Sequence, residues 1–113
     1  MRGIVEKGDG RGRALGYPTA NIPLPRANGP SGVWAARVTV KDGEASYMAA
    51  VFIDDAREVL ESHILDFDDE LYGVEIIVLL EKKLRESAQY AHDAELKAAI
   101  ANDIKQVRAH FKN

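Results

Sequence analysis

The stretch that decides the fold is Val33-Trp-Ala-Ala-Arg-Val-Thr-Val40, which is followed by Lys41-Asp-Gly-Glu44 and a second apolar run over residues 45–53. β-Branched and aromatic residues favour strands, and Asp-Gly between two such runs is typical of a hairpin turn. We therefore predict an antiparallel hairpin with strands over 33–40 and 45–53.

Further strands are expected on both sides of this hairpin. Residues 4–5 open a short first strand, 59–67 form another, and the apolar run in 71–84 predicts a strand buried on both faces. Residues 8–30 are rich in Gly, Pro and Asn and predict a loop with at most brief extended pieces. Because these strands follow one another without helices between them, the sequence predicts a small antiparallel sheet or barrel.

One helix is expected at the C-terminal end. Apolar residues recur there every three or four positions, which predicts an amphipathic helix that flanks the sheet. These residues are Leu96, Ile100, Ile104, Val107 and Phe111. Asp93 is predicted to cap the first turn with its carboxylate.

Length, charge and composition narrow the class of protein. The 113 residues fit one domain over 1–113, and the net charge of -3 argues against nucleic-acid or membrane-surface binding. There is no Cys and the three His lie far apart, so a bound metal would have oxygen ligands. No apolar run approaches the ~20 residues that cross a bilayer, and the N-terminus lacks a secretory signal. We expect a cytoplasmic protein.

The segment Gly8-Asp-Gly-Arg-Gly-Arg-Ala-Leu-Gly-Tyr-Pro-Thr-Ala-Asn21 draws attention for its chemistry. Its glycine spacing matches neither a dinucleotide fold nor a P-loop, and a flexible loop is one interpretation. The other is a phosphate site, because glycines allow an anion-binding nest and Arg11 and Arg13 can neutralise phosphate oxygens. In an extended segment Thr19 and Asn21 point to the same side, and their oxygens suit Mg²⁺.

Glu61 is a candidate general base. In a strand over 59–67 it shares one face with Val59, His63, Leu65 and Phe67, which puts a carboxylate among apolar side chains. The alternative is an exposed face on which Glu61 is a solvated charge. His63 is either a partner of Glu61 or a packing residue.

The run Gly8 to Asn21 resembles the signature of the riboflavin kinase (flavokinase) family, which phosphorylates riboflavin with ATP to give FMN. The resemblance continues through Gly32-Val-Trp-Ala35, Leu60-Glu-Ser-His-Ile-Leu-Asp-Phe67, Leu71-Tyr-Gly73, Leu84-Arg85 and Ala99-Ile100-x-x-Asp103-Ile104. It implies a mainly β fold, a six-stranded antiparallel Greek-key barrel with a C-terminal α-helix.

The resemblance also implies roles for individual residues. Glu61 would accept the proton of the ribityl 5'-hydroxyl as that oxygen attacks the γ-phosphoryl group. Thr19 and Asn21 would bind Mg²⁺, or another divalent ion, together with ATP, and Arg85 and Tyr90 would bind the substrate. The nucleotide and phosphate ligands would be Gly8, Gly10, Arg11, Gly12, Arg13, Gly16, Thr19 and Asn21. Riboflavin and ATP are then the expected partners of a monomer that binds neither nucleic acid nor membrane.

The chain departs from the family pattern in residues 50–60. This stretch lacks the Gly and the Pro-Thr of the family's Asn-Ile-Gly-x-x-Pro-Thr and is shorter. The departure motivates an alternative, a non-catalytic flavin or nucleotide sensor on the same barrel, whereas a plain structural barrel would leave the motifs unexplained. In many bacteria this module follows a nucleotidyltransferase domain that converts FMN to FAD. Because 113 residues leave no room for that domain, FAD synthesis is not expected.

Overall fold

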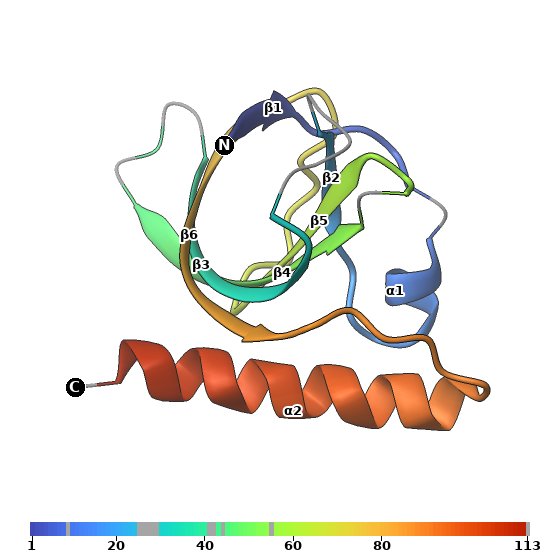
Figure 1. Ribbon diagram of the computed structural model, residues 1–113. Coiled ribbons are helices and arrows are strands. Elements are labelled where there is room, and N and C mark those ends of the chain that lie inside the picture. Colours follow the sequence, from blue (N-terminus) through green and yellow to red (C-terminus); the bar gives the residue numbers. More distant parts are fainter. Residues whose placement is uncertain (9, 25–29, 41–42, 44, 55, 113) are drawn as a thin grey trace.

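The computed structural model describes residues 1–8, 10–24, 30–40, 43, 45–54 and 56–112. Within them the chain forms six strands and two helices, and Figure 1 shows the strands curled into a ring with the longer helix across one side. In chain order the elements are β1 (Arg2–Ile4), α1 (Arg11–Ala14), β2 (Ala20–Pro23), β3 (Gly32–Val40), β4 (Ser46–Asp54), β5 (Val59–Ile64), β6 (Glu75–Arg85) and α2 (Asp93–Phe111).

The strands form one antiparallel sheet in the order β1-β6-β3-β4-β5-β2. Strands β3, β4 and β5 follow one another as neighbours, and β6 then returns beside β3, which is the Greek-key arrangement. The two edges of the sheet approach each other where the backbone N–H of Glu6 donates to the carbonyl oxygen of Asn21 at 2.7 Å. The predicted fold class, a six-stranded Greek-key barrel with a C-terminal helix, is confirmed, and so is the hairpin of β3 and β4.

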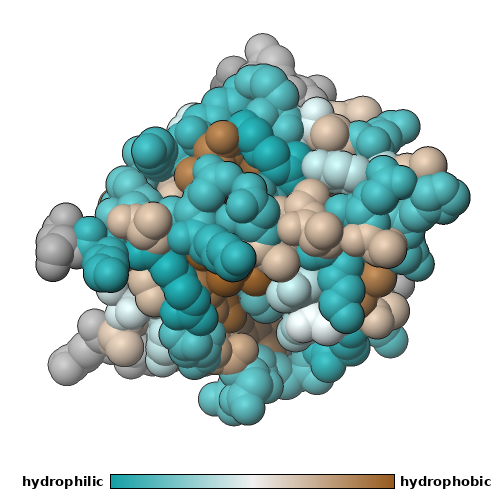
Figure 2. Space-filling view, turned by 90° about the horizontal axis from the view of Figure 1, so that it is seen from below, coloured by the Kyte–Doolittle hydropathy of each residue, from teal (hydrophilic) through white to brown (hydrophobic). Residues whose placement is uncertain are grey.

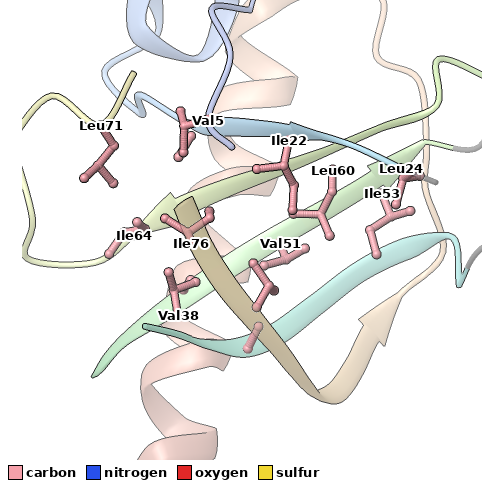
Figure 3. Close-up of a cluster of buried hydrophobic side chains, with 14 residues drawn as sticks. Val5, Ile22, Leu24, Val38, Val51, Ile53, Leu60, Ile64, Leu71 and Ile76 are labelled. Atoms are coloured by element: carbon pink, nitrogen blue, oxygen red, sulfur yellow. The ribbon is translucent and has the colours of Figure 1, made fainter. Parts of the chain in front are cut away.

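Side chains from every second position of the strands fill the barrel. Figure 3 shows them converging from opposite walls. The largest of these fully buried apolar side chains are Ile22, Val38, Val51, Ile53, Leu60, Ile76 and Val78. Removing each from water stabilises the fold by about 1.5–3 kcal/mol, so this cluster is the main source of stability of the barrel.

A second apolar cluster lies outside the barrel, under α2. Ala35 of β3 and Ala50 of β4 are cross-strand partners with no exposed surface, and their small side chains allow the helix to pack closely. From the helix, Val107 and Ile100 are buried in the way that the predicted apolar stripe requires. Among the described residues, neither helix combines the length and the apolar character needed to traverse a bilayer.

Strand β6 corrects one prediction. Its apolar run predicted burial on both faces, but only the inward face is covered. Ile77 and Leu79 are 36% and 59% exposed, because α2 packs chiefly over β4 and β3 and leaves this outer face open. The uninterrupted apolar run therefore predicted more burial of β6 than the packing of α2 provides.

Three local predictions also differ from the structure. The segment predicted as loop contains the short helix α1, and Asp93 is the first helical residue, with His92 as the N-cap. The strand predicted over 59–67 ends at Ile64, since the backbone turns away at Asp66, where φ is +60°. Of the predicted turn at 41–44, three residues lie outside the described part of the chain.

Candidate active site

The register between β2 and β5 brings the two predicted halves of the site together. Asn21 and Glu61 are direct cross-strand partners, so their side chains leave the sheet on the same face. The Thr19 hydroxyl donates a hydrogen bond to Oδ1 of Asn21 at 2.8 Å, so those two side chains do lie on one side. The Pro-Thr-Ala-Asn motif and the candidate base, forty residues apart in sequence, are thus neighbours.

A cavity of about 610 Å³ opens beside this pair of strands. Its lining residues come from the segment around α1, the β4–β5 turn, the end of β6 and the N-terminal half of α2. Figure 1 shows where these elements lie. Its lining combines apolar side chains with a comparable number of polar and charged ones, and its volume is typical of small-molecule sites. Among the lining residues are Gly12, Thr19, Phe52, Arg57, Glu61, Arg85, Tyr90 and Ile100. Seen from the α2 side, the surface is mostly hydrophilic, with hydrophobic residues visible in a hollow near its centre (Figure 2).

Glu61 reaches this cavity with a half-buried side chain. Nη1 of Arg57 lies 3.5 Å from its Oε2, so the carboxylate sits beside a cation and not among apolar side chains alone. Val59 and His63 share its face as predicted, but Leu65 and Phe67 do not, because β5 has already ended. Sequence reasoning missed Arg57, which belongs to the stretch that departs from the family pattern.

The Gly-rich segment is compact and packs on Asn21. A Cβ on Gly8 would lie 1.9 Å from Nδ2 of Asn21, so only glycine allows this close approach. The amides of residues 14–17 donate to the carbonyl oxygens of Gly10, Gly12 and Arg13, and are therefore not available to a phosphate. Gly16 follows with a φ of +92°, a conformation that favours glycine.

The two predicted arginines of this segment are placed differently. Nη2 of Arg13 lies 3.6 Å from Oε1 of Glu70, on an exposed side chain outside the cavity lining. The side chain of Arg11 lies outside the described part of the structure. Of the predicted phosphate ligands, Gly12 and Thr19 line the cavity.

The oxygens of Thr19 and Asn21 can be tested as metal ligands. Two adjacent ligands of octahedral Mg²⁺ are about 2.9 Å apart, because each Mg–O bond is about 2.0–2.1 Å long. The observed separation of 2.8 Å fits that geometry. In the described ranges, no three His, Cys, Asp or Glu side chains gather into a metal-binding group. The donor set fits an ion that obtains its remaining ligands from water and phosphate.

Arg85, the last residue of β6, is held by Asp103 of α2. Its Nε donates to Oδ1 at 2.8 Å and its Nη2 to Oδ2 at 2.7 Å, while Asp103 has no exposed surface. These hydrogen bonds raise the pKa of Arg85 above its ordinary value. The guanidinium also lies 5.9 Å from the ring centroid of Tyr90, so the two predicted substrate residues are neighbours. The sequence carried a signal for Asp103, an acidic residue three positions after Ile100 on the apolar stripe of the helix.

His63 contacts the neighbouring loop. Its Nδ1 lies 2.8 Å from the carbonyl oxygen of Pro18, and its ring meets that of Tyr17 edge-on at 5.5 Å. These contacts support the packing interpretation of His63.

Comparisons with known proteins identify the family of this chain. The family model for riboflavin kinase (flavokinase) matches residues 1–111, and the chain therefore belongs to the riboflavin kinase family. The bifunctional riboflavin kinase/FMN adenylyltransferase of Escherichia coli (strain K12) is 40% identical over 98% of this chain, and the protein of that name from Haemophilus influenzae is 33% identical over 98%. The chain spans 37% and 38% of the length of these two relatives.

A solved structure shows the same fold. It is described as a macrolide-efflux protein from Streptococcus pneumoniae and superposes with a TM-score of 0.81 at 26% identity. The match covers 95% of this chain and 37% of the other.

Proposed function

We propose that this chain, as one domain over residues 1–113, transfers the γ-phosphoryl group of ATP to the 5'-hydroxyl of riboflavin, giving FMN and ADP. The observation that carries the proposal is the pairing of Asn21 with Glu61, whose side chain lines a cavity of ligand size together with Thr19. Membership of the riboflavin kinase family and relatives that carry this activity in their names support it.

Glu61 is the proposed general base. The ribityl oxygen forms a bond to the γ-phosphorus while the bond from that phosphorus to the β-phosphate oxygen breaks, and ADP leaves. The proton of the hydroxyl goes to the Glu61 carboxylate. Nη1 of Arg57, 3.5 Å from Oε2, places a positive charge beside this carboxylate. Phosphoryl transfer otherwise depends on positioning and on neutralising charge.

Thr19 and Asn21 are the proposed ligands of the Mg²⁺ that accompanies ATP. When bound, the ion neutralises charge on the phosphate oxygens. Thr19 lines the cavity, and its hydroxyl is hydrogen-bonded to Oδ1 of Asn21, so the two oxygens lie side by side next to the space where the triphosphate is proposed to lie. In the preceding segment the proposed phosphate ligands are Gly8, Gly10, Arg11 and Gly12. Arg13 and Gly16, which the family resemblance also implied, are not proposed, because Arg13 pairs with Glu70 outside the cavity lining and the Gly16 amide donates to the carbonyl oxygen of Arg13.

The flavin is proposed to lie toward the start of α2. Arg85 and Tyr90 supply a guanidinium and an aromatic ring, and Leu96 and Ile100 supply apolar surface in the same cavity. Planar aromatic ligands bind well against surfaces of this kind.

The test is to incubate the purified protein with riboflavin, ATP and Mg²⁺ and to measure FMN by chromatography. Formation of FMN that requires both ATP and the divalent ion is expected. If no FMN forms at high enzyme concentration, the kinase proposal fails, and riboflavin binding without turnover would favour the sensor.

Glu61→Gln tests the base. The amide keeps the shape of the side chain but cannot accept the proton, so kcat is expected to fall by about 10² to 10⁴-fold. Affinity for both substrates should stay within a few-fold. Glu58→Gln, in the exposed β4–β5 turn outside the cavity, is the matched control and should keep its rate. Turnover of Glu61→Gln near that of the unchanged protein would exclude this role.

A further inference from the structure

The ion pair of Arg85 and Asp103 is largely buried between β6 and α2. Asp103 has no exposed surface, the Arg85 side chain is 25% exposed, and both carboxylate oxygens accept from the same guanidinium. A buried pair of this kind loses so much hydration that an apolar pair of similar volume is often equally stable. What the pair adds is a fixed orientation, because two parallel hydrogen bonds hold the guanidinium plane.

The position of the pair connects that orientation to the cavity. Arg85 ends β6 and Asp103 lies in α2, so the pair joins the two elements that flank residues 86–92. That segment contributes Ser87, Ala88, Gln89 and Tyr90 to the cavity wall. Nη1 of Arg85 donates to the carbonyl oxygen of Glu86 at 3.2 Å, which ties the start of the segment to the same guanidinium.

We propose that Asp103 is a positioning residue for the acceptor substrate, which holds the Arg85 guanidinium and, through it, the Tyr90 wall of the cavity in the geometry that receives riboflavin. The inference rests on the proposed function. It concerns the riboflavin end of the cavity as proposed above, which is lined by Arg85, Tyr90 and the apolar side chains of α2, whereas the proposed metal ligand Thr19 lines the cavity from the segment before β2.

The decisive variant is Asp103→Asn. Its amide oxygen can accept one of the two hydrogen bonds, and its NH₂ group faces a donor, so the guanidinium is no longer held in one plane. We expect the KM and the Kd for riboflavin to rise by about tenfold, with the KM for ATP changed by less than about twofold. Quenching of riboflavin fluorescence measures the Kd without turnover.

Glu81→Gln is the matched control. Glu81 also joins β6 to α2, with Oε1 2.9 Å from Nε2 of His110 and Oε2 3.1 Å from Nε of Arg37, but it lies on the exposed surface outside the cavity lining. Weakening this contact between β6 and α2 should leave the KM for riboflavin and the KM for ATP unchanged. If it raises the KM for riboflavin as much as Asp103→Asn does, the effect belongs to helix docking in general and the proposal fails.

A second variant covers the case in which Asp103→Asn does not fold. Asp103→Glu keeps Arg85 and the negative charge but moves the carboxylate by one methylene group, and circular dichroism and the melting temperature show whether it is folded. Folded protein with weakened riboflavin binding is expected. Riboflavin affinity equal to that of the unchanged protein, in this variant or in folded Asp103→Asn, would overturn the proposal.

The assays separate this inference from the proposed function. If the unchanged protein binds riboflavin but forms no FMN, and Asp103→Asn weakens that binding, the kinase proposal fails while the role of Asp103 stands. If the unchanged protein forms FMN and Asp103→Asn has the same KM for riboflavin, only the role of Asp103 fails. If the unchanged protein neither binds riboflavin nor forms FMN, both fail.

Discussion

Replacing Gly8 by alanine tests how the Gly-rich segment supports the site. The added Cβ would lie 1.9 Å from Nδ2 of Asn21, whereas ordinary contacts begin at 3.4 Å, so one of the two must move by about 1.5 Å. Asn21 is only 5% exposed, and its Oδ1 is bonded to the Thr19 hydroxyl. The displacement therefore falls on both proposed metal ligands.

Gly8→Ala is expected to lower both the stability and the catalytic rate. Overpacking of this kind lowers the free energy of unfolding by about 1–3 kcal/mol. Displacing catalytic positions by about 1 Å can lower the rate by about 10²-fold, so we expect kcat to fall by that factor. The Mg²⁺ concentration at half-maximal rate should rise, because Thr19 and Asn21 no longer present their oxygens at 2.8 Å.

The assay is FMN formation against Mg²⁺ concentration, at a temperature where thermal melting shows that the variant is folded. Gly73→Ala is the control, since Gly73 has a φ of +79° with no atom within 4 Å of the added Cβ. That change should cost about 1 kcal/mol of backbone strain and leave kcat unchanged. Gly8→Ala with an unchanged kcat and Mg²⁺ dependence would refute the reasoning.

Two further predictions concern α2. Ala50 has no exposed surface, so Ala50→Leu adds volume where α2 packs on the sheet. Chemical denaturation should show a free energy of unfolding lower by about 1–3 kcal/mol. An unchanged free energy of unfolding would contradict the close packing inferred for this interface. The guanidinium of Arg108 holds the pKa of the Asp66 carboxyl below its ordinary value, so this pair contributes stability above about pH 4 and loses it as the pH falls through the lowered value. Near pH 7 the melting temperature of Arg108→Gln should therefore lie slightly below that of the unchanged protein, and in strong acid the two melting temperatures should be equal. A difference that persists in strong acid would contradict a stabilising role of this ion pair.

Local sequence predicted the elements that depend on local physics. The hairpin of β3 and β4 followed from β-branched residues around a turn, and α2 from apolar residues at helical spacing. Predictions that depended on which surface another element would cover were less reliable. Ile77 and Leu79 of β6 looked buried, but α2 does not cover them.

For the candidate site, the sequence by itself supplied Thr19, Asn21, Glu61, Arg85 and Tyr90 as candidates, because their chemistry and motifs can be read residue by residue. The tertiary structure decided which of them meet. Pairing of Asn21 with Glu61 depends on the β2–β5 register, and the approach of Gly8 to Asn21 depends on how the first loop packs over that strand.

Arg57 and Asp103 meet their partners only in the folded chain, where Arg57 pairs with Glu61 and Asp103 pairs with Arg85. The physical reason is that a side chain's type is local information, whereas its partners are set by contacts between segments far apart in the chain, which form when the barrel closes and α2 packs against it.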